Sequence, residues 1–110
     1  MQLAVEGRQI ELDKEGFLKN LTDWNEAVAE VIAQNETINL TEAHWEIIRI
    51  TRNFYQTFQI SPSMRALVKI TRQTLGEEKG NSIYLLKLFP VSPAKFASKI
   101  AGLPKPPNCL

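Results

Sequence analysis

The 110-residue sequence contains few of the residues that usually bind metals or act as catalytic nucleophiles. It has one cysteine, Cys109, and one histidine, His44. A lone cysteine cannot form an internal disulfide bond, and one histidine with one cysteine does not make a zinc site. We interpret His44, which lies beside Trp45 in the first turn of a predicted helix, as structural or surface-exposed rather than catalytic. The sequence also lacks a glycine-rich phosphate loop and a serine nucleophile-elbow motif. We therefore expect no metal and no cofactor, and Cys109 remains the candidate nucleophile.

Long apolar segments are absent as well. No apolar run approaches the roughly 20 residues that cross a bilayer, and the first residues lack the basic start and apolar stretch of a signal peptide. Without a disulfide framework, a reducing cytoplasm fits the composition best, with no membrane partner. The chain length, the 44% hydrophobic content and the 23% charged content suit one soluble domain with one core.

Acidic residues are missing from the stretch between residues 47 and 76. Residues 1–46 carry ten acidic and three basic residues, a net charge of −7, whereas residues 47–110 carry two acidic and ten basic residues, a net charge of +8. The basic half could face nucleic acid or an acidic protein. Alternatively, the two halves fold together and neutralise each other, which is the interpretation that we favour for most of these charges.

Turn and capping residues predict one hairpin followed by helices. Residues 3–5 and 8–12 read as two strands joined at Gly7, which supplies the positive φ of a tight turn. The expected helices run from Asp23 to about Asn35, over about 42–58 after Thr41, over 62–75 between Ser61 and Gly76, from Asn81 until Pro90, and from Pro93, after Ser92, to Gly102. The helix over about 42–58 has the widest apolar face, so we expect it to be the central core helix.

These elements predict a mainly α fold. We expect a small helical bundle with an N-terminal β-hairpin, a helix-turn-helix-like pair and a mobile C-terminal arm. Residues 1–102 would form the single helical domain, and residues 103–110 the extended arm that bears the cysteine.

The C-terminal tail is rich in proline. Pro104, Pro106 and Pro107 forbid a helix there and favour an extended segment, which we expect to be exposed after Gly102. A thiol at the end of such a segment is either incidental or carries a nucleophilic sulfur into a pocket of another protein. Its position alone leaves both interpretations open, because the reactivity of a thiol depends on its surroundings.

The predicted helix over residues 62–75 carries a stripe of basic residues. Arg65, Lys69 and Arg72 recur at i, i+4 and i+7, and a tight turn joins this helix to the preceding one. In a helix-turn-helix regulator the second helix would enter the major groove of DNA. A basic stripe is often only a solvated helix face, so DNA binding is an alternative and not the main interpretation.

Several motifs along the whole chain together resemble the TusE/DsrC family. They are Gly76-Glu77-Glu78-Lys79-Gly80-Asn81-Ser82, Leu88-Phe89-Pro90, Pro93-Ala94-Lys95, and Lys99-Ile100-Ala101-Gly102-Leu103-Pro104-Lys105-Pro106 with Cys109. The upstream matches are His44-Trp45-Glu46, Asn53-Phe54-Tyr55 and Ser61-Pro62. Members of this family are small, mostly helical sulfur carriers with an N-terminal hairpin, and they hold a persulfide on the penultimate cysteine of a mobile arm. The resemblance implies that Cys109 is the catalytic residue.

One position separates the two branches of this family. DsrC proteins carry a second cysteine at the position that is Ser98 in this chain. Without that cysteine the chain cannot form the intramolecular disulfide of DsrC proteins, and it is similar to the single-cysteine TusE branch. The resemblance implies a sulfurtransferase that relays persulfide sulfur towards 2-thiouridine at the wobble position of tRNA. A DsrC-like partner of dissimilatory sulfite reductase and a helix-turn-helix DNA-binding regulator remain the alternatives.

The implied relay needs two protein partners. An upstream sulfur-relay protein would donate the persulfide, and a downstream tRNA thiouridylase, alone or in complex with tRNA, would accept the sulfur. The docking residues that we expect are Arg65, Lys69, Arg72 and Lys105. Lys99 and Lys105 would favour the thiolate form of Cys109, whereas the terminal carboxylate opposes it. Full activation would then depend on the partner's pocket.

Overall fold

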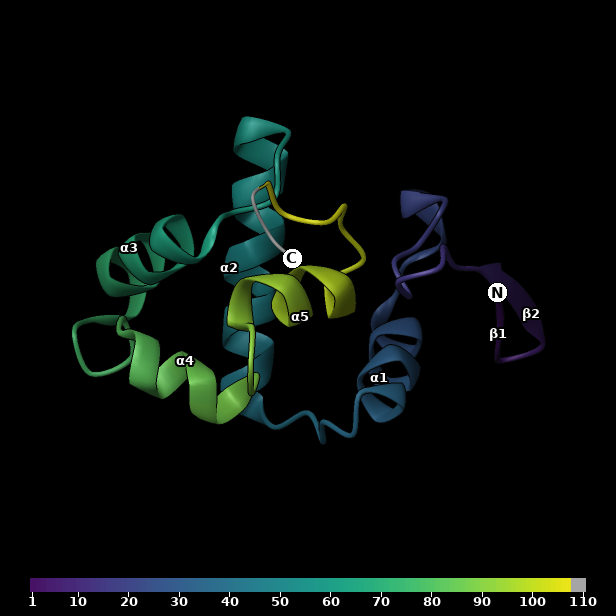
Figure 1. Cartoon of the computed structure of the whole chain (residues 1–110), viewed down its shortest axis with the longest axis horizontal. Coiled ribbons are helices and arrows are strands. Elements are labelled where there is room, and N and C mark those ends of the chain that lie inside the picture. Colours follow the sequence, from purple (N-terminus) through teal and green to yellow (C-terminus); the bar gives the residue numbers. More distant parts are fainter. Residues whose placement is uncertain (108–110) are drawn as a thin grey trace.

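The computed structural model of the chain describes residues 1–107 and shows a bundle of helices with a β-hairpin at its N-terminal end (Figure 1). The elements in chain order are β1 (Gln2–Val5), β2 (Arg8–Glu11), the 3₁₀ helix η1 (Leu21–Asp23), α1 (Glu26–Asn35), α2 (Glu42–Phe58), α3 (Met64–Leu75), α4 (Ser82–Leu88) and α5 (Pro93–Ile100). The predicted mainly α fold with an N-terminal hairpin is confirmed. No helix in this part of the chain combines the length and apolar character that crossing a lipid bilayer requires.

The hairpin has the tight turn that the sequence predicts. β1 and β2 pair antiparallel, with Leu3 opposite Ile10 and Val5 opposite Arg8. Glu6 and Gly7 between them have φ angles of 49° and 79°, and two positive φ values are typical of the two-residue turn that matches the twist of the strands. Val5 and Ile10 are buried, and β1 packs against α1. The hairpin therefore gains from the helices the burial that two strands alone lack.

α1 begins later than its sequence pattern suggests. Asp23 does not cap it, because Asp23 is the last residue of η1. The cap is Asn25, whose side-chain oxygen accepts a hydrogen bond from the backbone N–H of Val28 at 2.8 Å. Asparagine is as good a cap as aspartate, so the pattern around Asp23 and Asn25 is ambiguous from sequence. Trp24 consequently lies before the helix and not on its inward face.

α3 also begins later than predicted. The sequence assigns Ser61 as its cap and Pro62 as its first residue, but the cap is Ser63, whose hydroxyl accepts from the backbone N–H of Ala66 at 3.2 Å. Gly76 ends α3 as expected. The other predicted caps, Thr41, Asn81 and Ser92, are correct. The misplaced cap is informative, because Ser61 is used elsewhere in the fold.

The short helix α5, and not the long helix α2, lies at the centre of the bundle. α2 is the longest helix, but α5 is the element that packs against all four other helices (Figure 1). The prediction that the helix over residues 42–58 is central is wrong in this respect. α5 can be enclosed because Ala94, Ala97 and Ser98 are small and buried, and small side chains allow neighbouring helices to approach closely. The chain therefore leaves α5 from the centre of the bundle.

Candidate functional site

The candidate nucleophile Cys109 lies outside the described residues. The structure instead shows how the bundle holds the C-terminal segment, residues 103–107, which leads to that residue. This segment begins at the end of α5, so the site is built from the side chains that fix the last turn of α5 and the first residues beyond it.

Trp24 and Arg52 hold the last turn of α5. The indole N–H of Trp24 donates to the carbonyl oxygen of Ile100 at 2.8 Å, and Nη1 of Arg52 donates to the carbonyl oxygen of Ala101 at 2.7 Å. Both carbonyls are among the groups that a helix end leaves without intrahelical partners. The guanidinium carbon of Arg52 also lies 3.8 Å from the ring centroid of Trp24, in a cation–π contact. Burial lowers the pKa of the Arg52 guanidinium, which nevertheless keeps its charge at neutral pH.

Gly102 lets the chain turn away from α5 at this point. Its φ angle is 73°, a value that residues with a Cβ rarely adopt. A Cβ at this position would also overlap the side chain of Trp24. The glycine is therefore required twice, once by the backbone angle and once by the close approach of the indole ring.

The C-terminal segment does not leave the body directly. The sequence predicts exposure after Gly102, and this prediction is wrong for the first residues: Leu103 is only 4% exposed and Pro106 is buried. The backbone N–H of Leu103 donates to the carbonyl oxygen of Ser98 at 3.0 Å. Leucine and proline bury apolar surface against the bundle, which outweighs the tendency of a proline-rich segment to stay solvated.

Two polar contacts anchor the C-terminal segment further along. The hydroxyl of Ser61, which is 2% exposed, donates to the carbonyl oxygen of Pro104 at 2.6 Å. Lys105 forms an ion pair with Glu15, with a distance of 2.9 Å between Nζ and Oε2. The hydrogen bond from Lys105 lowers the pKa of the Glu15 carboxyl, and the nearby charge of Lys95, whose Nζ lies 3.7 Å from Oε2, acts in the same direction.

The ion pairs show how the opposite charges of the two halves are balanced. Each ion pair among residues 1–107 joins an acidic residue of the first 46 to a basic residue beyond it. The pairs are Glu42–Arg49, Glu46–Lys79, Glu15–Lys95, Glu36–Lys99 and Glu15–Lys105. The interpretation that the halves neutralise each other is therefore confirmed for five of the ten basic residues between residues 47 and 107.

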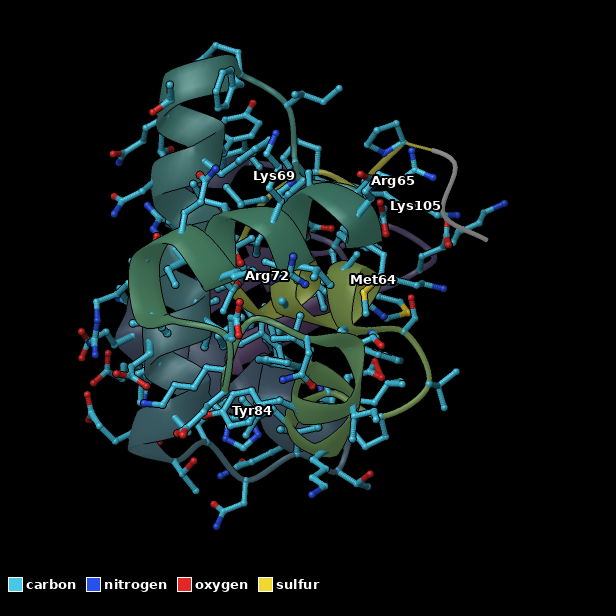
Figure 2. All side chains as sticks on the ribbon, turned by 90° about the vertical axis from the view of Figure 1, so that its left-hand side faces the viewer. Met64, Arg65, Lys69, Arg72, Tyr84 and Lys105 are labelled. Atoms are coloured by element: carbon cyan, nitrogen blue, oxygen red, sulfur yellow. The ribbon has the colours of Figure 1, made fainter. Side chains whose placement is uncertain are left out.

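The basic stripe on α3, formed by Arg65, Lys69 and Arg72, belongs to the half of these basic residues that form no ion pair with a described residue; the other two are Arg52 and Lys87. All three residues are exposed, and Figure 2 shows them on the face of the molecule that α3 and α4 form. They line one groove together. Nε of Arg72 donates to the carbonyl oxygen of Gly80 at 3.1 Å, whereas Arg65 and Lys69 make no hydrogen bond or ion pair with any described residue. The structure thus brings these three together, and it pairs the fourth predicted docking residue, Lys105, with Glu15.

His44 and Lys99 have structural partners. Nε2 of His44 donates to the carbonyl oxygen of Leu88 at 2.8 Å, and its Nδ1 accepts from the backbone N–H of Thr41 at 3.1 Å. This histidine is 7% exposed and ties α2 to the end of α4, as the structural interpretation predicts. Lys99 is 5% exposed, and its charge is balanced by Glu36 at 3.1 Å.

Sequence reasoning missed the residues that hold the segment: Glu15, Trp24, Arg52 and Ser61. Each contacts a part of the chain far away in sequence: Glu15 and Lys105 are 90 positions apart, and Ser61 and Pro104 are 43 positions apart. A single sequence carries no periodic signal for such pairs. The one local hint was the serine at position 61, but the sequence pattern explained it as a helix cap.

Comparisons with known proteins point in one direction. Residues 4–110 match the protein family described as "DsrC like protein". Sulfurtransferase TusE of Yersinia pestis is 59% identical over 108 residues, which cover 98% of this chain and 99% of that protein. Sulfurtransferase TusE of Escherichia coli (strain K12) is 55% identical over 108 residues, with the same shares. The NMR structure of Allochromatium vinosum DsrC matches with a TM-score of 0.90 and 49% identity, covering 99% of this chain and 97% of that one.

Proposed function

The chain belongs to the DsrC-like protein family, and from this membership we propose that it is a sulfurtransferase of the TusE kind, carrying persulfide sulfur on Cys109. The observation that carries the proposal is the identity of 55–59% to sulfurtransferases named TusE along almost the whole chain. The only cysteine stands at the penultimate position, where the family resemblance places the carrier sulfur. No second residue of the chain offers a thiol.

The chemistry is a transfer of one sulfur atom between thiols. The thiolate of Cys109 attacks the outer sulfur of a donor persulfide, so that a new S–S bond forms while the S–S bond of the donor breaks. The donor leaves as a thiolate, and Cys109 becomes a persulfide, with no net oxidation or reduction. An acceptor thiolate then attacks the outer sulfur of Cys109 and releases the Cys109 thiolate. A free cysteine is only a few per cent ionised at pH 7, so the donor's pocket is expected to favour the thiolate.

The C-terminal segment, which forms the first part of the proposed arm, supports this chemistry because the bundle holds it in place. Trp24 and Arg52 hold the turn at Gly102, and Ser61 and Glu15 hold the next residues. We place the boundary between the helical domain and the arm after Gly102, with residues 103–110 as the arm. A held origin restricts the directions in which the last residues can extend, which reduces the entropy lost when the arm docks into a partner.

The proposal also specifies where the sulfur is delivered and which proteins take part. The TusE resemblance supports delivery towards 2-thiouridine at the wobble position of tRNA in the cytoplasm. The donor would be an upstream sulfur-relay protein, and the acceptor a tRNA thiouridylase, alone or with tRNA bound. Docking to these partners would use Arg65, Lys69 and Arg72 on α3, with Lys105 in the arm.

The two alternatives are less well supported. A DsrC-like role with sulfite reductase would use the intramolecular disulfide, but Ser98 occupies the position of the second cysteine. The helix-turn-helix alternative rests on the pair α2 and α3, and membership of the DsrC-like family explains that pair without DNA. We therefore retain the sulfurtransferase as the proposed function.

A cellular measurement tests the destination. In cells whose own copy is replaced by this chain or by its Cys109→Ser variant, 2-thiouridine in tRNA hydrolysates is quantified by mass spectrometry. The wild-type chain should sustain the modification, and the variant should abolish it while its protein level stays the same. Normal 2-thiouridine with Cys109→Ser would contradict delivery to tRNA. Stable co-purification with a sulfite reductase would instead favour the DsrC-like alternative.

A further inference from the structure

The groove between α3 and the start of α4 has a chemistry that the exchange of sulfur between thiols does not itself require. Its volume is about 690 Å³. Met64 and Val68 give it an apolar part, and Arg65, Lys69 and Arg72 line it with positive charge. Figure 2 shows Met64 and the three basic residues on this one face. A groove that combines apolar and basic side chains is the arrangement expected of a surface that binds an acidic, amphipathic partner.

The charge of the groove is available to a partner. Arg49, Lys79, Lys95, Lys99 and Lys105 are each balanced by an acid of this chain. Arg65 and Lys69 have no such acid among residues 1–107. No acidic residue lies between residues 47 and 76 of the sequence, and the described groove lining contains none either. A carboxylate that enters the groove therefore meets no competing acidic side chain among residues 1–107.

The spacing of the basic residues fits a helix. Arg65, Lys69 and Arg72 at i, i+4 and i+7 extend over about 10 Å along α3, because each residue of an α-helix rises by about 1.5 Å. Three glutamates with the same spacing on a second helix extend over the same distance. The apolar residues between those glutamates would then face Met64 and Val68, as knobs of one helix enter holes of another.

RNA fits the same groove less well. Grooves that bind single strands combine positive charge with aromatic side chains on which the bases stack. The described residues that line this groove include no aromatic side chain: beyond the apolar and basic residues of α3 they are Asn81 and Ser82. The side chain of Asn81 is also occupied, since its oxygen caps α4 and its amide donates to the carbonyls of Glu77 and Glu78.

The groove lies beside the origin of the arm. Ser61, which donates to the carbonyl oxygen of Pro104, precedes the first residue of α3 by only three positions. A protein that receives the arm is therefore placed to contact the groove as well.

From these observations we propose that the α3–α4 groove docks an acidic amphipathic helix of a partner protein. The identification of this partner as a sulfur donor or acceptor rests on the proposed function. The argument from the chemistry of the groove is independent of that function. Docking here would hold the partner while the arm enters its pocket. The expected effect is on association and on salt sensitivity, and not on the reactivity of the thiol.

Binding of a designed peptide to the isotope-labelled full chain, followed by NMR, tests this proposal. The probe is a synthetic helical peptide of about 18 residues, long enough to form a helix, with glutamates at i, i+4 and i+7 beside a leucine stripe. Its scrambled sequence and a short single-stranded RNA are the comparison ligands. The peptide should shift the amide signals of Met64, Arg65, Val68, Lys69 and Ser82, and the scrambled peptide should not.

Variants locate the binding to the groove. Arg65→Glu and Lys69→Glu together should weaken peptide binding about tenfold or more, and Val68→Thr, which keeps the shape but removes apolar surface, should weaken it severalfold. Arg72 is left unchanged because it also holds Gly80. Lys87→Glu is the matched control, since Lys87 is exposed on α4 but does not line the groove, and it should leave binding within about twofold. Unchanged thermal unfolding would show that each variant folds.

Three results would overturn the inference. They are equal binding of the scrambled peptide, shifts outside the groove, and tighter binding of the RNA at the same residues. Each of these leaves the sulfurtransferase proposal intact if Cys109 still accepts sulfur from a small persulfide donor. Conversely, peptide binding by a protein whose Cys109 accepts no sulfur would contradict the sulfurtransferase proposal and support the docking groove.

Discussion

Arg52 stacks on Trp24, with the guanidinium carbon 3.8 Å from the centroid of the ring, and the two side chains bind successive carbonyls at the end of α5. Trp24 comes from the loop before α1 and Arg52 from the middle of α2. Together they fix the turn at which the C-terminal segment begins. The stack therefore connects the fold of the bundle to the placement of the arm.

Replacing Arg52 should destabilise the protein more than replacing a neighbouring surface arginine. Arg52→Met keeps the apolar stem but removes the cation and leaves the carbonyl of Ala101 without its donor. We expect the free energy of unfolding to fall by about 2 kcal/mol, measured by chemical denaturation. Arg49→Met is the control, because the Arg49 side chain is 57% exposed, and its effect should stay within about 0.5 kcal/mol. Equal effects of the two would contradict the role of the stack.

Gly102 should not tolerate a methyl group. Gly102→Ala combines a strained φ of 73° with an overlap against Trp24, so we expect a loss of about 2–5 kcal/mol in unfolding free energy. Gly7→Ala separates the two causes. Gly7 also has a positive φ, of 79°, but a Cβ there would meet nothing within 4 Å, so its loss should be about 1–2 kcal/mol. A Gly102→Ala variant no less stable than Gly7→Ala would show that the indole ring does not restrict this position.

Two buried serines should respond in opposite ways to the same change. Ser61→Ala leaves the carbonyl of Pro104 without a donor, and we expect a loss of about 1–2 kcal/mol. The hydroxyl of Ser98 is buried and makes no hydrogen bond within residues 1–107. Ser98→Ala should therefore be neutral, or stabilising by up to about 1 kcal/mol. Thermal unfolding of both variants under one condition compares them, and a destabilised Ser98→Ala would reveal a partner for that hydroxyl.

The ion pair between Lys105 and Glu15 should weaken in acid. The pKa of Glu15 lies below its ordinary value of 4.5, first because Lys105 donates a hydrogen bond to it. A carboxyl with a depressed pKa stabilises the fold fully above its unfolded pKa, and loses that contribution as the pH falls through the lower, folded pKa. Glu15→Gln should therefore unfold at a lower temperature than the wild type at pH 7. The difference should shrink as the pH falls below 4.5.

Calorimetry across this pH range measures the difference. Glu30→Gln is a suitable control, since Glu30 is exposed on α1 and forms no ion pair with a described residue. A gap between wild type and Glu15→Gln that stays constant down to the lowest pH would show that the ion pair with Lys105 does not contribute.

Local signals were sufficient for most of the fold. A threonine before residue 42, an asparagine before residue 82 and the Ser92-Pro93 pair each mark a helix start, because capping depends on residues only a few positions apart. The same rule failed where two candidates stood close together. Ser61 and Ser63 flank one proline, and only the tertiary contact of Ser61 with Pro104 decides which of them caps α3.

The candidate site was predictable only in part. The basic stripe on α3 follows from helical spacing, which the sequence displays. Its lack of partners does not follow, because it depends on which acids the fold brings near each base. The burial of Leu103 and the pairing of Lys105 with Glu15 likewise join residues distant in the chain. Composition showed that the two halves have opposite charge, but only the fold assigns the pairs.

The sulfur-carrier function of Cys109 is tested most directly by mass spectrometry of the protein after incubation with a persulfide donor. The peptide that contains Cys109 should gain about 32 Da, the mass of one sulfur atom, and a reducing agent should remove this gain. Cys109→Ser, with unchanged thermal unfolding, should gain nothing. Wild-type protein that takes up no sulfur, or a gain that persists in Cys109→Ser, would contradict the proposed function.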